Sequence, residues 1–317
     1  MKFIKRMKKI PWIRKIQYRI ELMFMRLFML LIWSGNPGGL QRGAEICGWI
    51  AFKILKVRKK VVLENLRNSF PEKNEEEIVQ IAKNAYINFT KTVIDYIRFP
   101  VLDKRKIPDM IELEGKEHLD WVRKNGKGAV MVAGHFGSWE LMGAALALMG
   151  YPISYLVGKQ HNKYVDDIMN EYRKMMGIHI IHMGIAVRGV IRTLRNNGMV
   201  ALLADQNAGK EGIFIDFLGR KASAHQGPAV FAIKTGAPII YGSTTFLPKG
   251  RYKIKIELLT FENITTLTSE NIRKVTQAHL NLLEKSIHKN PDHWFWMHRR
   301  WKTRPPEERK TKKINNI

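Results

Sequence analysis

From residue 116 onward, short apolar runs alternate with longer stretches whose apolar residues recur at helical spacing. The runs Ala129–Ala133, Ile153–Val157 and Val200–Ala204 are predicted strands, and the helical stretches Trp139–Met149 and Val165–Met176 lie between them. Further predicted elements are helices at Lys116–Asn125, Ala186–Asn196, Pro228–Thr235 and Ser269–His288, and strands at Ile178–Ile181, Pro238–Tyr241 and Tyr252–Leu258. Because helical crossovers join parallel strands, the sequence predicts an α/β fold, with a mostly parallel sheet and flanking helices.

A long helix is predicted before this region. Asn74 is a suitable N-cap, and the acidic residues 75–77 after it favour the positive end of the helix dipole. Apolar residues then recur at helical spacing from Ile78 to Ile97, and Pro100 ends the pattern. We interpret the apolar face of this helix as core packing.

The charge of the chain narrows its possible partners. The sequence has 54 Lys and Arg against 28 Asp and Glu, a formal net charge of +26. Such a surface attracts nucleic acid, anionic lipid or acidic proteins. The basic residues cluster in 1–20, 53–60 and 299–313, beside apolar or Trp-rich segments, and no known nucleic-acid module is visible. This arrangement favours membrane lipids over nucleic acid as the partner.

The N-terminal apolar stretch Leu22–Trp33 contains Arg26. A membrane span needs roughly 20 apolar residues, and a central Arg costs about 2.5–3.5 kcal/mol. Both flanks are basic, which favours the same side of a membrane for both ends. We therefore expect residues 1–60 to form a membrane-associating helical region at the lipid interface, with a single span or a core helix as alternatives. Residues 61–317 are the predicted catalytic domain.

The most informative motif lies where the first central strand ends. His135 follows the strand between two glycines, Ser138 can cap the next helix, and Glu140 falls in its first turn. From there Glu140 can turn back toward the imidazole. A neutral His can take a proton from a hydroxyl, and a carboxylate can hold its tautomer and stabilise the imidazolium. A strand-end histidine and a surface acid are the alternative, but the Gly-His-x-Gly-Ser-x-Glu context favours catalysis by this pair.

This motif resembles the His-x4-Asp/Glu motif of lysophospholipid and glycerolipid acyltransferases. Most of the chain is similar to one branch of that superfamily, the lipid A biosynthesis (late) acyltransferases of the lauroyl- and myristoyl-transferase type. The segments that carry the resemblance are Asn65–Glu72, Asp205–Gly209, Phe217–Arg220, Gly227–Pro238 and Trp294–Arg304. The chain departs from the family where an Arg precedes an Asn, because Gly158 or Lys159 stands there before Asn162.

The resemblance implies an O-acyltransferase of lipopolysaccharide biosynthesis. It would move a fatty acyl chain from an acyl thioester, on acyl carrier protein, to a hydroxyl of a lipid A precursor. The expected place is the cytoplasmic face of the bacterial inner membrane, and no cofactor is expected. An acyltransferase for another glycolipid, such as a phosphatidylinositol mannoside, is the nearest alternative. A basic nucleic-acid-binding protein and a non-catalytic membrane scaffold are more distant ones.

Candidate substrate-binding residues follow the predicted strands. Arg220 follows an apolar run and can clamp a phosphate with two parallel hydrogen bonds, or can pair with Asp216 at the surface. Asp205 and Gln206 follow Val200–Ala204, at the strand end where α/β folds bind ligands, although an Asx-turn would also explain Asp205.

Two further basic residues are candidates for substrate binding. Arg188 resembles a basic position of the family but also suits a solvated helix face. Lys159 can replace the family's Arg as a point charge but not as a bidentate donor.

The Trp-rich segment 294–301 has two interpretations: a seat at the lipid interface, or a strap that covers the core. A metal site is not expected. His179 and His182 flank a short strand with no Asp, Glu or Cys nearby to complete a ligand set, and the single Cys47 excludes an intramolecular disulfide.

Overall fold

The computed structural model describes residues 12–183, 186–259, 261 and 264–308. Its centre is a seven-stranded sheet of order β1-β9-β8-β2-β5-β3-β4. Every neighbouring pair is parallel except β8 and β9, so the predicted mostly parallel α/β sheet is confirmed. The strands are β1 (Ile111–Glu114), β2 (Ala129–Ala133), β3 (Ile153–Val157), β4 (His179–His182), β5 (Met199–Leu203), β8 (Ile239–Leu247) and β9 (Arg251–Leu259).

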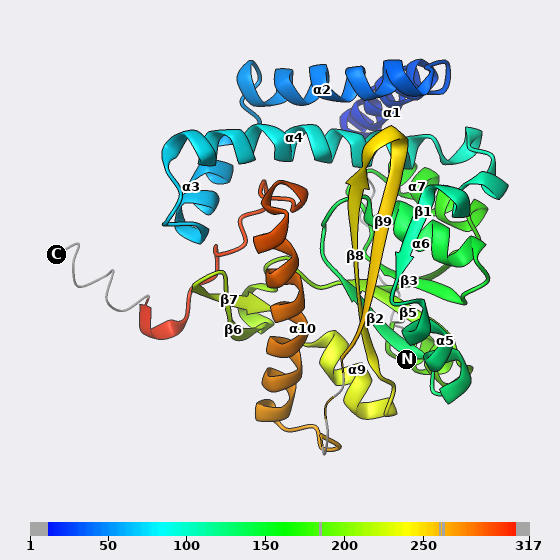
Figure 1. Ribbon diagram of the computed structural model, residues 1–317, viewed down its shortest axis with the longest axis vertical. Coiled ribbons are helices and arrows are strands. Elements are labelled where there is room, and N and C mark those ends of the chain that lie inside the picture. The colour runs from blue at the N-terminus through cyan, green and yellow to red at the C-terminus, as the bar shows by residue number, and fades with distance from the viewer. Residues whose placement is uncertain (1–11, 184–185, 260, 262–263, 309–317) are drawn as a thin grey trace.

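Helices cover the sheet on both faces, and a separate hairpin lies beside it (Figure 1). The hairpin joins β6 (Ile213–Phe217) to β7 (Arg220–Ala224). The helices are α1 (Trp12–Trp33), α2 (Pro37–Lys53), α3 (Lys59–Ser69), α4 (Glu75–Ile97), α5 (Lys116–Asn125), α6 (Trp139–Leu148), α7 (Lys163–Met175), α8 (Ala186–Arg195), α9 (Gly227–Thr235) and α10 (Ser269–Lys289). The elements predicted from residue 74 onward are confirmed, although their ends differ, and β8 continues to Leu247 rather than ending at Tyr241. The strands β1 and β7 and the helix α3 were not predicted.

The central strand β2 explains why the molecule has two cores. All its residues are buried, and successive side chains point to opposite faces. Val130 and Val132 pack into the core beneath α8, α9 and α10, whereas Met131 and Ala133 pack into the core beneath α5 and α6. Because both faces of β2 are buried, all its residues are apolar and the strand shows no alternation of apolar and polar residues.

Helix α4 links the N-terminal helices to the rest of the molecule. It begins with the predicted cap: Asn74 accepts from the backbone of Glu77, whose side chain accepts from the backbone of Asn74. One side of α4 packs against α2 and α1 (Figure 1). On the other side, Thr92 donates to the carbonyl of Gly137, in the loop after β2.

Helix α2 runs alongside α4 at one end of the molecule, and α1 lies next to both (Figure 1). Tyr18, Met29 and Ile32 are buried against the protein, whereas Leu27 and Leu31 on the outer side are 51% and 71% exposed. A membrane-spanning helix is not found among the described helices, since none is both long and apolar enough.

The Trp-rich segment is a buried strap rather than an aromatic surface. Trp294, Trp296 and Trp301 are 2%, 1% and 7% exposed. The amide of Asn65, on α3, donates to the carbonyls of Trp296 and His298 at 3.0 Å each. The strap interpretation is confirmed, because these rings fill the core between α3 and the hairpin and are not available to lipid. A contact of the basic residues of this segment with lipid phosphates stays a prediction. We call residues 294–301 the strap.

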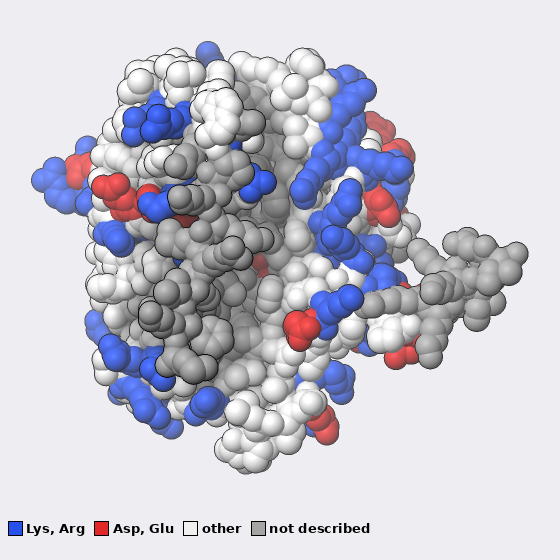
Figure 2. Space-filling model, turned by 180° about the vertical axis from the view of Figure 1, so that it is seen from behind, with Lys and Arg blue, Asp and Glu red and all other residues white. Residues whose placement is uncertain are grey.

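The face opposite to the view of Figure 1 is hollowed at its middle (Figure 2). A ridge of Lys and Arg side chains borders this hollow, on the side where α3 lies (Figure 2). Exposed basic residues at the end of α2 and around the start of α3 are Lys53, Lys56, Arg58 and Lys60. The start of α3 also contacts the strap, because the guanidinium of Arg58 donates to the carbonyl of Met297.

Candidate active site

His135 lies in the loop after β2, and Asp205 lies just after β5. These two strands are parallel neighbours, with Ala133 opposite Leu203, so their carboxyl ends meet at the same edge. The backbone N–H of His135 donates to Asp205 Oδ2 at 2.9 Å, and ring Nδ1 lies 2.8 Å from Oδ1. Since an ionised carboxylate only accepts, Nδ1 carries a proton and Nε2 of the neutral ring is the free base.

Charge and burial act in opposite directions on this pair. Burial lowers the pKa of His135, but the charge and hydrogen bond of Asp205 outweigh burial and raise it above its ordinary value. Burial likewise favours a raised pKa for Asp205, yet the charge of His135 and the hydrogen bonds to the carboxylate lower it to about 2. Asp205 is therefore ionised at neutral pH and stabilises an imidazolium whenever His135 takes up a proton.

The strap completes this arrangement from the other side. The indole N–H of Trp294 donates to Asp205 Oδ2 at 2.8 Å. The backbone N–H of Phe295 donates to the carbonyl of His135 at 3.0 Å, and Phe136 forms an antiparallel bridge with Trp294. The loop that carries His135 is therefore held by β5 and by the strap together.

The loop itself needs a glycine and a buried acid. Gly137 has a φ of +56°, and a Cβ there would lie 1.8 Å from the carbonyl oxygen of Thr244. Ser138 Oγ donates to Asp95 of α4 at 2.8 Å, and the hydroxyl of Tyr252 donates to the same carboxylate at 2.7 Å. Burial raises the pKa of Asp95 to about 6. These contacts fix the turn from β2 into α6 and so the direction of the His135 ring.

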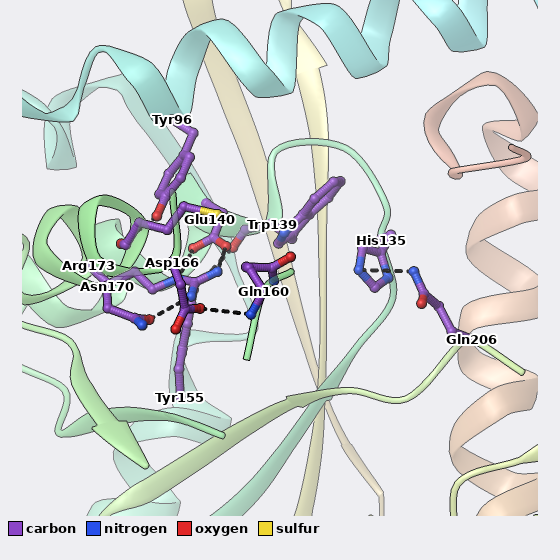
Figure 3. A network of polar contacts seen from close by, with 11 residues as sticks. Tyr96, His135, Trp139, Glu140, Tyr155, Gln160, Asp166, Asn170, Arg173 and Gln206 are labelled. Carbon is purple, nitrogen blue, oxygen red and sulfur yellow. Dashed lines mark hydrogen bonds and ion pairs between the residues drawn. The ribbon is translucent and has the colours of Figure 1, made fainter. Parts of the chain in front are cut away.

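Glu140 does not make the contact that we expected with His135. Its two oxygens pair instead with the guanidinium of Arg173, on α7, at 2.5 and 3.1 Å. Figure 3 shows Trp139 between Glu140 and His135. Position Nδ1 of His135 is taken by Asp205, so the prediction that Glu140 orients the imidazole was wrong in its geometry. Glu140 still acts on His135 through its charge, which contributes to the raised pKa of the ring.

Position Nε2 of His135 faces the side chain of Gln206. The His135 side chain is 20% exposed, and the amide nitrogen of Gln206 lies 3.4 Å from Nε2 (Figure 3). The ring of Trp139 contacts that of His135 edge-on, with centroids 5.0 Å apart. Three predicted site residues thus meet here: His135, Asp205 and Gln206. A hydroxyl that displaces Gln206 from Nε2 would be placed for proton transfer.

Arg220 opens β7, at some distance along the chain from this cluster, and lies against the strap. Its guanidinium stacks on the ring of Trp301 at 3.6 Å and donates to Ser69 at 3.4 Å. Its Nε is buried without a partner among the described residues. Asp216, its alternative partner, pairs with Lys221 instead. Burial and the nearby charge of Arg304 lower the pKa of Arg220 to about 10.

The other two candidate residues are at the surface. Lys159 is exposed in the loop between β3 and α7, and Arg188 is exposed on α8. No hydrogen bond or ion pair between either of them and the His135 cluster appears within the described part of the chain. Their roles in substrate binding stay predictions.

Sequence reasoning missed two residues at this site. Arg173 sits among the polar residues of an amphipathic helix, where nothing in the pattern distinguishes a buried ion pair from a solvated charge. Trp294 belonged to a recognised segment, but only the fold brings its indole to Asp205. Within the described ranges, no group of three or more His, Cys, Asp or Glu side chains is placed to hold a metal ion.

Comparison with known proteins identifies relatives of nearly the whole chain. The family described as bacterial lipid A biosynthesis acyltransferase matches residues 7–303. The lipid A biosynthesis palmitoleoyltransferase of Escherichia coli (strain K12) is 24% identical over 295 residues, 92% of this chain and 94% of that protein. The lauroyltransferase of the same organism is 25% identical over 261 residues, 81% of this chain and 83% of that protein.

A second group of relatives acts on a different glycolipid. The phosphatidylinositol mannoside acyltransferase of Mycobacterium tuberculosis (strain ATCC 25618 / H37Rv) is 24% identical over 214 residues. The match spans 65% of this chain and 66% of that protein, just under two thirds of its length.

Proposed function

Since this chain belongs to the bacterial lipid A biosynthesis acyltransferases, we propose that it transfers a fatty acyl chain from acyl carrier protein to a hydroxyl of a lipid A precursor. The relatives named above support an acyltransferase of lipid A or glycolipid type. The observation that carries the proposal is the pair of His135 and Asp205, which leaves Nε2 as the unprotonated nitrogen of a side chain that is 20% exposed at the carboxyl edge of the sheet.

The geometry supports direct transfer without a covalent acyl-enzyme. Nε2 of His135 takes the proton of the acceptor hydroxyl while its oxygen attacks the thioester carbonyl. The new C–O bond forms, the C–S bond breaks, and the leaving thiolate receives the proton from the imidazolium. Asp205 stays ionised throughout, because its pKa lies at about 2. Its charge stabilises the imidazolium that exists between the two proton transfers.

Arg220 is the proposed contact for a phosphate of the acceptor. Its guanidinium is partly desolvated and its Nε has no partner among the described residues, and the charge of Arg304 acts on it more strongly than that of Glu64. A phosphate would satisfy these donors bidentately. Arg220→Lys should therefore weaken use of a phosphorylated acceptor at least 10-fold, while the matched control Lys221→Ala should not. Equal use of a dephosphorylated acceptor by wild type and Arg220→Lys is also expected; a loss there would exclude a phosphate contact.

We propose further that the protein works at the cytoplasmic face of the inner membrane, with α1 against the lipid. The outer side of α1 exposes Phe24, Leu27 and Leu31, and Arg19 and Arg26 are exposed on the same helix. Apolar burial combined with basic residues is typical of interfacial helices.

Vesicle flotation with purified variants tests the membrane proposal. On vesicles that contain phosphatidylglycerol, Leu27→Glu together with Leu31→Glu should reduce the bound fraction several-fold. Gln17→Glu adds charge to the same helix at an exposed polar position and should bind almost as wild type does. Equal binding of the double variant would place another surface against the lipid.

One assay tests the reaction itself. The purified chain is incubated with acyl carrier proteins that bear acyl chains of several lengths, and with either a lipid A precursor or a phosphatidylinositol mannoside. Mass spectrometry should find one added acyl group on the lipid A precursor, with wild type but not with His135→Ala. Acylation of the mannoside alone would reassign the acceptor. If folded wild-type protein acylates neither acceptor with any of these donors, the proposed function is wrong.

A further inference from the structure

Asp205 receives one of its hydrogen bonds from a residue that nothing so far has assigned to the reaction. Trp294 donates its indole N–H to Oδ2, the oxygen that also accepts from the backbone of His135. The Trp294 side chain is buried at 2% exposure, and its ring packs edge-on against Trp296 and Phe217, with centroids 4.7 and 5.6 Å apart. In this packed orientation the indole N–H points at the carboxylate.

We propose that Trp294 is a positioning residue for acyl transfer: its indole N–H holds one oxygen of Asp205 and leaves the other for the ring of His135. The proposal rests on the proposed function in one respect, the role of His135 as the base. Among the described residues, Oδ2 accepts only from Trp294 and from the backbone of His135, and Asp205 is 2% exposed, so little water can replace the indole donor.

The bond has two physical effects on the base. It prevents rotation of the carboxylate, because Oδ2 is held by two N–H groups and only Oδ1 faces Nδ1. It also takes a share of the negative charge that would otherwise act on the imidazolium. Without the indole N–H, Asp205 would hold the proton of His135 more strongly, and His135 would remain protonated, and useless as a base, to a higher pH.

The position of the strap strengthens the assignment. The residue after Trp294 donates its backbone N–H to the carbonyl of His135, and Trp294 itself bridges the backbone of Phe136. The strap is therefore joined to the loop of His135 through its backbone and to Asp205 through the indole. Trp296 provides the contrast, because it is equally buried in the same strap but its indole donates to the carbonyl of Pro291, away from Asp205.

The first test needs no substrate. The full chain, labelled at Cε1 of its histidines and held in detergent, is titrated by NMR as wild type, Trp294→Phe and Trp296→Phe. The resonance of His135 is the one that His135→Gln removes. Loss of the donor in Trp294→Phe should raise the midpoint of His135 by on the order of half a pH unit. Trp296→Phe should leave it within error of wild type.

The second test is the pH dependence of transfer by the same proteins. In Trp294→Phe the acid limb of kcat should move to higher pH, and kcat should fall several-fold on that limb, with little change in the KM for the acceptor. An unchanged titration and pH profile would overturn the proposal. A midpoint that moves down would overturn it as well, because the indole would then not share the charge of Asp205.

The two tests fail separately. If the midpoint of His135 moves as expected but wild type acylates no acceptor, the proposed function falls and the role of Trp294 toward His135 stands. If wild type is active and Trp294→Phe titrates and turns over as Trp296→Phe does, the proposed function stands and the inference falls. Should Trp294→Phe not fold, Trp294→β-(3-benzothienyl)alanine keeps the ring shape and replaces only the N–H by sulfur.

Discussion

Two carboxylates influence His135, and they do so in different ways. Asp205 touches both the ring and the backbone of the histidine. Glu140 lies beyond Trp139, bound to Arg173, and reaches the ring only through its charge (Figure 3). Contact determines the tautomer of a histidine, whereas distant charge adjusts its proton affinity. The two acids should therefore leave different signatures when each is removed.

Replacement of His135 should remove the general base. His135→Ala should lower the transfer rate by about 10²–10⁴-fold, which is the usual contribution of a general base. The fold should persist, because the His135 side chain is one of the less buried groups of its loop. The rate is measured with saturating acceptor and the fold by circular dichroism and thermal unfolding. Turnover near that of wild type would exclude His135 as the base.

The acid limb of the pH profile should distinguish Asp205 from other groups. Because the folded pKa of His135 is raised, wild-type activity should fall as pH drops through a value above the ordinary histidine pKa. Asp205→Asn removes the charge that raises it, so the limb should move to lower pH while kcat falls strongly. If the acid limb of Asp205→Asn lies at the same pH as that of wild type, the limb reports the titration of a group other than His135.

Glu140→Gln should affect stability as well as rate. Arg173 would keep a buried charge without its partner, and loss of one member of a buried pair costs about 3–5 kcal/mol. The rate should fall with little change in acceptor affinity, since Glu140 contacts Arg173 and not the lipid. Denaturant unfolding and initial-rate kinetics measure the two effects. A loss confined to acceptor KM would make Glu140 a binding residue.

Among the elements, α3 and the strap depend on each other. Asn65→Ala removes both amide bonds to the strap and should lower the free energy of unfolding by about 1–3 kcal/mol. Transfer should fall with it, because the strap supports Asp205 and the loop of His135. Asn68→Ala, on the exposed side of the same helix, bonds only within α3 and should change little. Equal effects of the two changes would show that the strap holds its place without α3.

Sequence reasoning succeeded where one element carries all the information. The apolar run of β2, the glycines around His135 and the cap at Asn74 are local signals, and each was placed correctly. It failed where two elements meet. The partner of His135 depends on β5 being the neighbour of β2, and no pattern within either strand states that order.

The resemblance to a family gave motifs but not their contacts. The early segment around Asn65 and the strap were both recognised, and the structure shows that they bind one another. In the same way, Asp205 was predicted as a substrate contact because it follows a strand, whereas the structure places it against His135. Burial cannot be read from an isolated Asp or Trp, so neither Asp205 nor Trp294 received its proper role from the sequence.

For the whole molecule, net charge is the property that acts at long range. A net charge of +26 should speed the encounter with an acidic carrier protein more than with coenzyme A, which presents less surface to the field. The Debye length is about 8 Å at physiological salt, so the advantage should shrink as salt rises. We expect kcat/KM for acyl carrier protein to fall more steeply with salt than that for acyl-coenzyme A.

This comparison requires detergent-solubilised acceptor, because salt also weakens binding to anionic lipid. Charge reversal at two exposed basic residues around the start of α3, Lys56→Glu and Lys60→Glu, should reduce the carrier-protein rate and its salt dependence together. If acyl-coenzyme A were the better donor at low salt, the positive charge of the protein would serve to bind lipid and not the carrier protein.

Because the strap lies near the C-terminal end of the described chain, the active site can be completed only late in synthesis. Helix α1, which we propose to lie against lipid, leaves the exit tunnel before the strands of the sheet, since domains form in order during synthesis. Asp205 lacks its indole donor, and the loop of His135 lacks its outer support, until residues 294–301 have emerged. If α1 binds lipid as proposed, a nascent chain would reach the membrane before its active site is complete, and a premature stop after α10 would release a protein whose Asp205 lacks the indole donor.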